Sequence, residues 1–524
     1  MENQHYSLET QKFIEEFVAL SNIKNLRSGN EQMMHSALFY EKLRTAVDYQ
    51  EDHLIFKNAV ERIIKRKFAL SFSVSAESLY NDLIDELAWA DHINPDSIKT
   101  EDVHKIKHII HRYIVLLHSV KPSVFKQYDN QKIIISWLAA EIDEMLYNHK
   151  PQELLVDFAY DALKDNLRSS TPQFFHKESE LQLKLALKTL IYKPDFAYIQ
   201  FWVAKKIYPK FNDFTLEEAK NIGAHFDEFL FQIDKVFNSP FRKEYLVYAK
   251  KNIAPFLLIK ELPHYQNSLE VYRNQPQILH VWLMDIYDSA LVKTRDKVWR
   301  GTIRALIFIL ITKISLALLI EVPYDKMFQG GVEYFPLMIN ILVPPALMFL
   351  SGISIVKPSA KNRQITANMI NNLIFYRKLD DKPFFINPHR KSGLELFFDG
   401  LYFLLNLAIL IAVVYLLVRI GFNVLSIILF FFFVSAVSFF SFRIRNIALE
   451  LSVHRSRDNF FISTIEFLFL PFVLIGKLLS AAVSKYNPLI ITLDFLIEAP
   501  LKTIIRIINF WLKFVRQKKE DIDI

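Results

Sequence analysis

Residues 396–442 read LFFDGLYFLLNLAILIAVVYLLVRIGFNVLSIILFFFFVSAVSFFSF, and this run decides the class of the protein. It contains two stretches, Leu396–Val418 and Phe422–Phe442, that are each apolar and long enough to cross roughly 30 Å of hydrocarbon as a helix. Two more such stretches lie upstream, at Thr302–Ile320 and Phe335–Val356. The sequence therefore predicts a membrane domain over residues 302–442 with four transmembrane helices.

The half of the chain before this domain is poor in glycine. The chain has 10 glycines, and only Gly29 and Gly223 lie within the first 300 residues. Turn-rich all-β folds use glycine in hairpins and bulges, and phosphate-binding loops need several glycines so that backbone amides reach the anion. We therefore expect a helical domain, and we expect no nucleotide-binding loop in it.

Amphipathic patterns support this expectation. Thr100–Val120 has an apolar stripe at helical spacing and acidic residues in its first turn. Thr215 and Glu218 form the pattern of a capping box, which predicts a helix from Thr215 to Phe237. Similar patterns cover Gln11–Asn25, Glu77–Asp91, Gln131–Asn148, Glu153–Leu167 and Glu178–Tyr192. The predicted fold is all-α, with a soluble multi-helix domain over 1–284 and a charged linker helix over 285–301 before the polytopic α-helical membrane domain.

Charge predicts the orientation of the membrane helices. The connection 357–395 holds eight basic residues, and the segment 443–458 after the fourth helix holds four arginines, whereas the other two connections are short and carry little positive charge. Basic connections stay in the cytoplasm. The first residues also lack the apolar core of a signal peptide. We expect a multi-pass protein of the cell membrane with its N-terminal domain and its C-terminal tail in the cytoplasm.

The C-terminal region 443–524 allows two interpretations. Residues 460–483 are apolar but contain Glu466 and Pro471, so they form either a re-entrant segment or a crossing. Residues 489–516 place polar side chains every three or four positions, which indicates an amphipathic helix in the interface, followed by a basic tail. Four crossings are favoured over six, because the polar stripe opposes full burial in lipid.

Composition also excludes several chemistries. The chain has no cysteine, so it has no disulfide, no thiolate nucleophile and no cysteine-ligated metal. Residues 1–300 carry 39 Lys and Arg against 41 Asp and Glu, so the soluble domain lacks the basic excess that nucleic-acid binding needs. No catalytic motif occurs. We expect no enzymatic activity, no catalytic or cofactor-binding residues, no metal site and no nucleic-acid partner.

Lys313 is the sharpest candidate for function. It lies near the middle of the first predicted transmembrane helix, where an unpaired charge costs several kcal/mol. We expect Glu466 to pair with it by depth, with Asn340 and Asn406 as polar neighbours from the second and third helices. Such a pair either lines a path for an ion or substrate or fixes two helices together.

Two groups of surface residues complete the list of candidates. His104, His108, His111 and His118 share one helix face, and the basic residues around them favour a solvated or partner-facing surface over a metal site. In the connection 357–395, basic and aromatic residues indicate a membrane-surface segment that favours anionic lipids. The candidate contacts to anionic lipid are Arg377, Lys378, Lys382, Arg390 and Lys391.

These observations leave three functional hypotheses. The leading one is a membrane-anchored interaction or scaffold protein whose helical domain binds a protein partner beside the lipid bilayer. The alternative is a small transporter or channel component that uses Lys313 and Glu466, for which a homo-oligomer would supply more translocation surface than four helices do. A lipid-modifying enzyme that uses His389 or His454 ranks last, because no motif supplies a nucleophile or a metal cage.

Overall fold

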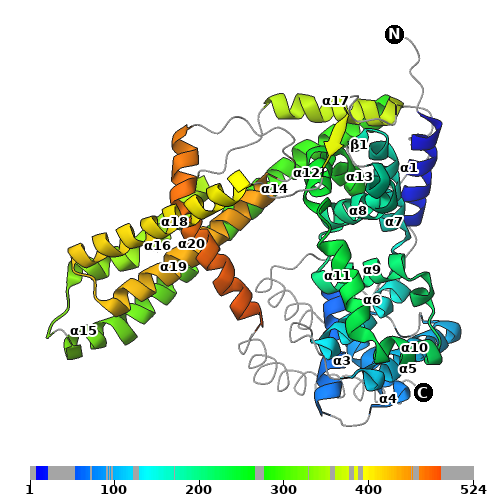
Figure 1. Cartoon of the computed structure of the whole chain (residues 1–524), viewed down its shortest axis with the longest axis horizontal. Helices are drawn as coiled ribbons and strands as arrows, with labels where there is room; N and C mark the ends of the chain where they lie inside the picture. Colours follow the sequence, from blue (N-terminus) through cyan, green and yellow to red (C-terminus); the bar gives the residue numbers. More distant parts are fainter. Residues whose placement is uncertain are drawn as a thin grey trace, which may run out of the picture. The chain divides into compact units, whose positions relative to one another are not determined.

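A computed structural model of the chain describes residues 7–21, 54–70, 74–89, 92–93, 95, 98–121, 129–169, 172–265, 276–328, 330–353, 360–376, 383–387, 393–449, 451, 460–485 and 511. Apart from two three-residue strands, the elements in these ranges are helices, which confirms the predicted all-α class (Figure 1). The chain divides into two compact units. The first contains Met1–Val292, Pro358–Lys391 and Glu450–Ser456, and the second contains the remaining segments.

One core of the first unit surrounds Trp137. This side chain is fully buried in α6 (Asn130–Leu146) and makes edge contacts with Phe211, Phe226 and Phe229 at centroid distances of 5.6, 5.6 and 6.0 Å. Aromatic side chains bury large apolar areas, so they dominate the energetics of such a core. The elements around it are α3 (Leu54–Leu70), α4 (Ala76–Trp89), α5 (Thr100–Ser119), α6 (Asn130–Leu146), α9 (Phe196–Ile207), η2 (Pro209–Asn212), α10 (Leu216–Ala224) and α11 (Phe226–Phe237).

A second core of the same unit draws on distant parts of the chain. It includes α1 (Leu8–Ser21), α7 (Lys150–Lys164), α8 (Pro172–Tyr192), α12 (Arg242–Asn252), α13 (Ala254–Tyr265), the start of α14 (Pro276–Leu316) and α17 (Ala360–Tyr376). Strand β1 (Leu167–Ser169) pairs in parallel with β2 (Phe384–Ile386), with Leu167 opposite Phe384. Ile370 of α17 and Ile386 of β2 are both fully buried in this core.

The connection between the second and third predicted membrane helices is therefore structured. The sequence predicts a basic loop over 357–395, but α17 and β2 lie inside it and supply buried side chains to the first unit. Ser7 N also donates to the Ile374 carbonyl oxygen at 3.2 Å, and Thr10 Oγ1 donates to the Leu373 carbonyl oxygen at 3.2 Å. This part of the connection belongs to the helical domain.

The predicted helix from Thr215 to Phe237 is two helices in the structure. The capping box of Thr215 and Glu218 is present and begins α10. The chain then breaks at His225 before α11 begins. Gly223 lies so close to α5 that a Cβ atom there would come within 2.6 Å of Ser119 Cβ, so only glycine permits this helix approach.

The second unit contains most of the candidate membrane helices. Four candidate spans, at Gln277–Phe328, Tyr334–Gly352, Gly393–Ile420 and Val424–Asn446, are long and apolar enough to cross a membrane. They correspond to α14 continued by the π-helical turn η4 (Ala317–Glu321) and α15 (Val322–Phe328), then to α16 (Tyr334–Ile353), α18 (Gly393–Ile420) and α19 (Val424–Ala448). Helix α19 packs against α16 and against α20 (Phe460–Lys485) (Figure 1).

Two predicted boundaries differ from the observed ones. The linker helix predicted over 285–301 is not a separate element, because α14 runs without a break from Pro276 to Leu316. The segment predicted over 460–483 forms α20, whose apolar described part, Phe467–Ser480, is shorter than the four spans. Except for Trp511, the amphipathic helix and basic tail predicted over 489–516 lie outside the described residues.

Candidate functional site

Three polar side chains meet inside the membrane unit, and we call them the Lys313 cluster. Lys313 Nζ lies 3.1 Å from Glu321 Oε1, and Asn340 Nδ2 lies 3.0 and 2.9 Å from the two Glu321 carboxylate oxygens. All three side chains are fully buried. The Lys313 ammonium also lies 4.7 Å from the ring centroid of Phe433 on α19. The cluster therefore joins α14, η4, α16 and α19 through buried charge.

The π-helical turn explains how two residues of one helix form this pair. Lys313 and Glu321 are eight positions apart, and eight residues of α-helix rotate by about 800°, which is about 80° beyond two full turns. Glu321 is the last residue of η4, where looser i→i+5 winding rotates each residue less. The turn thus brings Glu321 back toward the helix face of Lys313. Such π-bulges occur frequently at functional sites.

The side-chain amide of Asn340 donates hydrogen bonds through Nδ2 but accepts none through Oδ1 among the described residues. Besides its bonds to Glu321, Nδ2 donates to the Ser426 carbonyl oxygen at 3.3 Å. Its Oδ1 atom is buried and has no hydrogen-bond partner among the described residues. A buried polar atom without a partner carries a desolvation cost, so such an atom in a native protein requires an explanation.

A second carboxylate lies one helical turn beyond Glu321. Asp325 in α15 is 4% exposed, and Asn423 Nδ2 donates to its Oδ1 atom at 2.5 Å. No cationic side chain of the described residues lies within ion-pair distance of Asp325. Asn423 also accepts a bond of 2.7 Å from Ser426 N through its own Oδ1 and so caps the start of α19. The polar region therefore extends from Lys313 toward the end of α15 at Phe328.

The structure brings together two of the four predicted intramembrane residues. Lys313 and Asn340 meet at Glu321, which the sequence analysis places in the connection just beyond the first predicted helix. Asn406 instead donates to the Tyr402 carbonyl oxygen of its own helix at 2.7 Å. Glu466 lies in α20, but its side chain is outside the described residues, so its pairing with Lys313 stays a prediction.

The candidate anionic-lipid contacts also stay predictions, because all five lie outside the described residues: Arg377, Lys378, Lys382, Arg390 and Lys391. The histidine face is described. His104, His108, His111 and His118 are all exposed on α5. They lie on a surface of the first unit, and a partner for this surface stays a prediction.

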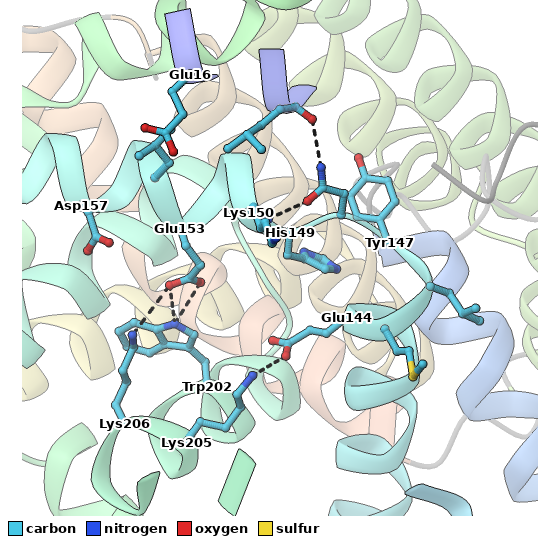
Figure 2. Close-up of a pocket in the computed structure, with 15 residues that line it drawn as sticks. Glu16, Glu144, Tyr147, His149, Lys150, Glu153, Asp157, Trp202, Lys205 and Lys206 are labelled. Atoms are coloured by element: carbon cyan, nitrogen blue, oxygen red, sulfur yellow. Dashed lines mark hydrogen bonds and ion pairs between the residues drawn. The ribbon is translucent and has the colours of Figure 1, made fainter. Parts of the chain in front are cut away.

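The first unit contains an open cleft that the sequence analysis missed. Its volume is about 860 Å³, and Figure 2 shows the side chains of α1, α6, α7 and α9 around it. Glu144 and Glu153 lie on the walls, opposite Lys205 and Lys206 from the end of α9. These residues come from different helices, so no local spacing in the sequence indicates that they share a cleft.

The charges of this cleft neutralise one another. Glu153 forms an ion pair with the buried Lys188. It also accepts a bond of 3.2 Å from Trp202 Nε1, and Lys206 Nζ lies 3.9 Å from its other oxygen (Figure 2). Burial alone raises the pKa of Glu153, but the charge and hydrogen bond of Lys188, together with Lys206 and Trp202, lower the pKa below its ordinary value. Glu144 pairs with Lys205. The cleft is a network of mixed charge and favours neither anions nor cations.

Comparison of the chain with protein-family models, with curated proteins and with solved structures gives no match.

Proposed function

We propose that this chain is a membrane-anchored interaction protein, in which a helical domain on the cytoplasmic face of the cell membrane is held by two transmembrane hairpins and binds a protein partner. The observation that carries the proposal is the composition of the first unit. Chain segments up to Val292 in the first part of α14, between α16 and α18, and after α19 all contribute to it.

The side chain of Asn362 joins three of these segments by hydrogen bonds. Its Nδ2 atom donates to the Tyr287 hydroxyl at 2.9 Å and to the Leu451 carbonyl oxygen at 3.0 Å. Tyr287 lies in the first part of α14, which belongs to the first unit up to Val292, Asn362 lies between α16 and α18, and Leu451 follows α19. Segments that share one folded core lie on one side of a membrane, so each pair of spans returns the chain to that side. Four crossings satisfy this requirement.

Charge supports the cytoplasmic side. The same segments include the basic connection 357–395 and the arginines after α19, and basic connections stay in the cytoplasm. The opposite turns, residues 330–333 and 421–423, contain no Lys or Arg. A domain anchored at several points along the chain suits the role of presenting a binding surface beside the bilayer.

Photo-crosslinking in intact cells tests the interaction. A photo-reactive residue replaces His111, Phe231 or Val247, three exposed positions on α5, α11 and α12. We expect one of these faces to give a discrete crosslinked product with a second protein, while a matched replacement of the lipid-facing Ile311 gives none. Failure of all three positions to crosslink a protein contradicts the interaction function.

The Lys313 cluster favours a second candidate, a small transporter or channel component. A buried lysine in a membrane-spanning helix is costly to maintain and commonly marks a path for an ion or substrate. Because the chain has no native cysteine, Lys313→Cys can be probed with a membrane-impermeant thiol reagent without background labelling. Labelling at 313, with Ile311→Cys protected, indicates that water reaches the cluster and favours transport. Protection at 313 removes this candidate.

A further inference from the structure

The charges around the Lys313 cluster do not balance. Lys313, Glu321 and Asp325 lie on one membrane-spanning segment and are at most 4% exposed. When ionised, they provide one positive and two negative charges. An uncompensated charge is expensive in a low-dielectric interior, so buried charges are paired or hold an ion. One positive charge is missing from this region.

The oxygen atoms around the same point are suited to a hard cation. Glu321 supplies two carboxylate oxygens, Ser426 a backbone carbonyl oxygen, and Asn340 the buried Oδ1 atom that has no partner among the described residues. Rotation of the Asn340 amide by half a turn exchanges Oδ1 and Nδ2. It would place a further oxygen beside the Glu321 carboxylate and the Ser426 carbonyl. A cation can bind among these oxygens, whereas the Nδ2 group that now lies there donates hydrogen bonds to them.

We propose that Glu321, Asp325 and Asn340 form a binding site for one monovalent alkali-metal cation, with Lys313 as a fixed positive charge beside it. The charge deficit selects a monovalent ion, because a divalent ion would leave one positive charge in excess. Alkali cations bind carbonyl and carboxylate oxygens in membrane proteins. Asp325 is three residues from the end of α15, so the cation enters from the side of the turns at 330–333 and 421–423.

This inference deepens the second candidate function by naming its ligand, and it does not depend on the partner of the helical domain. The site differs from the cleft of the first unit, whose carboxylates Glu144 and Glu153 already pair with lysines. Beside the Lys313 cluster, the one ammonium pairs with Glu321, and no lysine or arginine of the described residues forms an ion pair with Asp325.

The test measures the melting temperature of the full chain, purified in detergent, in NaCl, KCl or choline chloride at constant ionic strength. A ligand that binds only the folded state stabilises it in proportion to occupancy. We expect the melting temperature to rise in a saturable way with Na⁺ or K⁺ and to stay constant in choline. Equal melting temperatures in all three salts overturn the proposal, and the wild-type chain alone decides this point.

Three variants locate the site. Asp325→Asn removes the uncompensated charge and is expected to weaken the apparent cation affinity at least about ten-fold. Asp399→Asn changes an exposed carboxylate of α18 and is expected to respond as the wild type does. Lys313→Met enlarges the charge deficit and is expected to bind the cation more tightly, whereas a purely structural lysine would only lower the melting temperature.

Two outcomes overturn the assignment even if the wild type responds to Na⁺. One is an unchanged response in Asp325→Asn. The other is a rise of the melting temperature in choline chloride at lower pH that equals the rise with Na⁺. This result would mean that a proton occupies the site instead of a metal cation. Labelling of Lys313→Cys is measured separately. If the cysteine is labelled but the chain binds no alkali cation, the cation proposal fails and the transporter or channel function remains, with a different ligand.

Discussion

The side-chain amide of Asn362, fully buried in α17, lies 2.9 Å from the hydroxyl of Tyr287 in α14. The same amide donates to the carbonyl oxygen of Leu451 at 3.0 Å. One side chain thus connects the first part of α14 with the segment between α16 and α18 and the segment after α19. The helical domain is assembled from separated parts of the sequence, and its stability depends on contacts among them.

Replacement of Asn362 should weaken this assembly. Asn362→Leu keeps a similar volume but leaves the Leu451 carbonyl and the Tyr287 hydroxyl without this donor in a buried place, which costs about 1–3 kcal/mol. Denaturant unfolding of the full chain, followed by tryptophan fluorescence, measures the change. Asn368→Leu on the exposed face of the same helix is the matched control. Equal midpoints for the two variants would contradict the role given to Asn362.

The Lys313–Glu321 pair gives a prediction for the membrane unit. Removal of one partner leaves a buried charge uncompensated, so Lys313→Met or Glu321→Gln should each destabilise the protein by about 3–5 kcal/mol. The double variant Lys313→Met/Glu321→Gln removes both charges and should recover much of this loss. Thermal unfolding in detergent measures all four proteins as a double-mutant cycle. Additive losses would show that the two side chains do not interact.

Glu141 gives a pH prediction in the first unit. It accepts a hydrogen bond from the buried Arg112, which also donates to Asp213 Oδ1 at 2.8 Å. Burial raises the pKa of Glu141 from 4.5 to about 7, although Arg112 acts in the opposite direction. The folded state therefore binds this proton more tightly than the unfolded state does. The contribution of Glu141 to stability is full below about pH 4.5 and is lost as pH rises through about 7.

The Glu141→Gln variant isolates this contribution. Its free energy of unfolding, compared with that of the wild type at each pH, should show a relative gain of up to about 3 kcal/mol between acidic and neutral pH. Urea unfolding at a series of pH values measures the difference. Parallel stability profiles for the two proteins would show that Glu141 does not titrate in this window.

Close packing of α19 and α20 gives a fourth prediction. A Cβ atom on Gly476 would lie 2.2 Å from the Ser435 carbonyl oxygen and 2.6 Å from Phe439 Cβ, so Gly476→Ala should separate the helices and cost about 1–3 kcal/mol. Gly400→Ala on α18 meets nothing within 4 Å and is the control. Alanine favours helix more than glycine does, so the control should be neutral or slightly stabilising. Melting in detergent compares them, and an equal effect of both changes would contradict this packing.

The sequence predicted the parts of the fold that depend on local patterns. Long apolar runs determined the four candidate spans, and the Thr215–Glu218 capping box was found from spacing alone. The place of α17 was not predictable in this way. Its amphipathic pattern is compatible with any apolar surface, and only tertiary contacts bury Ile370 beside helices that lie far away in the sequence.

The candidate site shows the same limit. Lys313 and Asn340 were found because polar residues are rare in apolar runs. Glu321 was assigned to a connection because it directly follows the apolar run that ends at Ile320, and a π-helical turn leaves no clear signal in one sequence. Asp325 and Asn423 come together only when the ends of α15 and α19 meet.

Labelling of single cysteines in the cysteine-free chain tests the central claim most directly. Ser78→Cys lies on an exposed position of the helical domain, Gln364→Cys on the exposed face of α17, and Gly331→Cys in the opposite turn. With a membrane-impermeant thiol reagent, intact cells should label only position 331, and lysed cells should label all three. In intact cells, labelling of both Gly331→Cys and Ser78→Cys would contradict a cytoplasmic helical domain. Labelling of Gln364→Cys but not of Ser78→Cys would contradict the claim that the two transmembrane hairpins return these segments to one side.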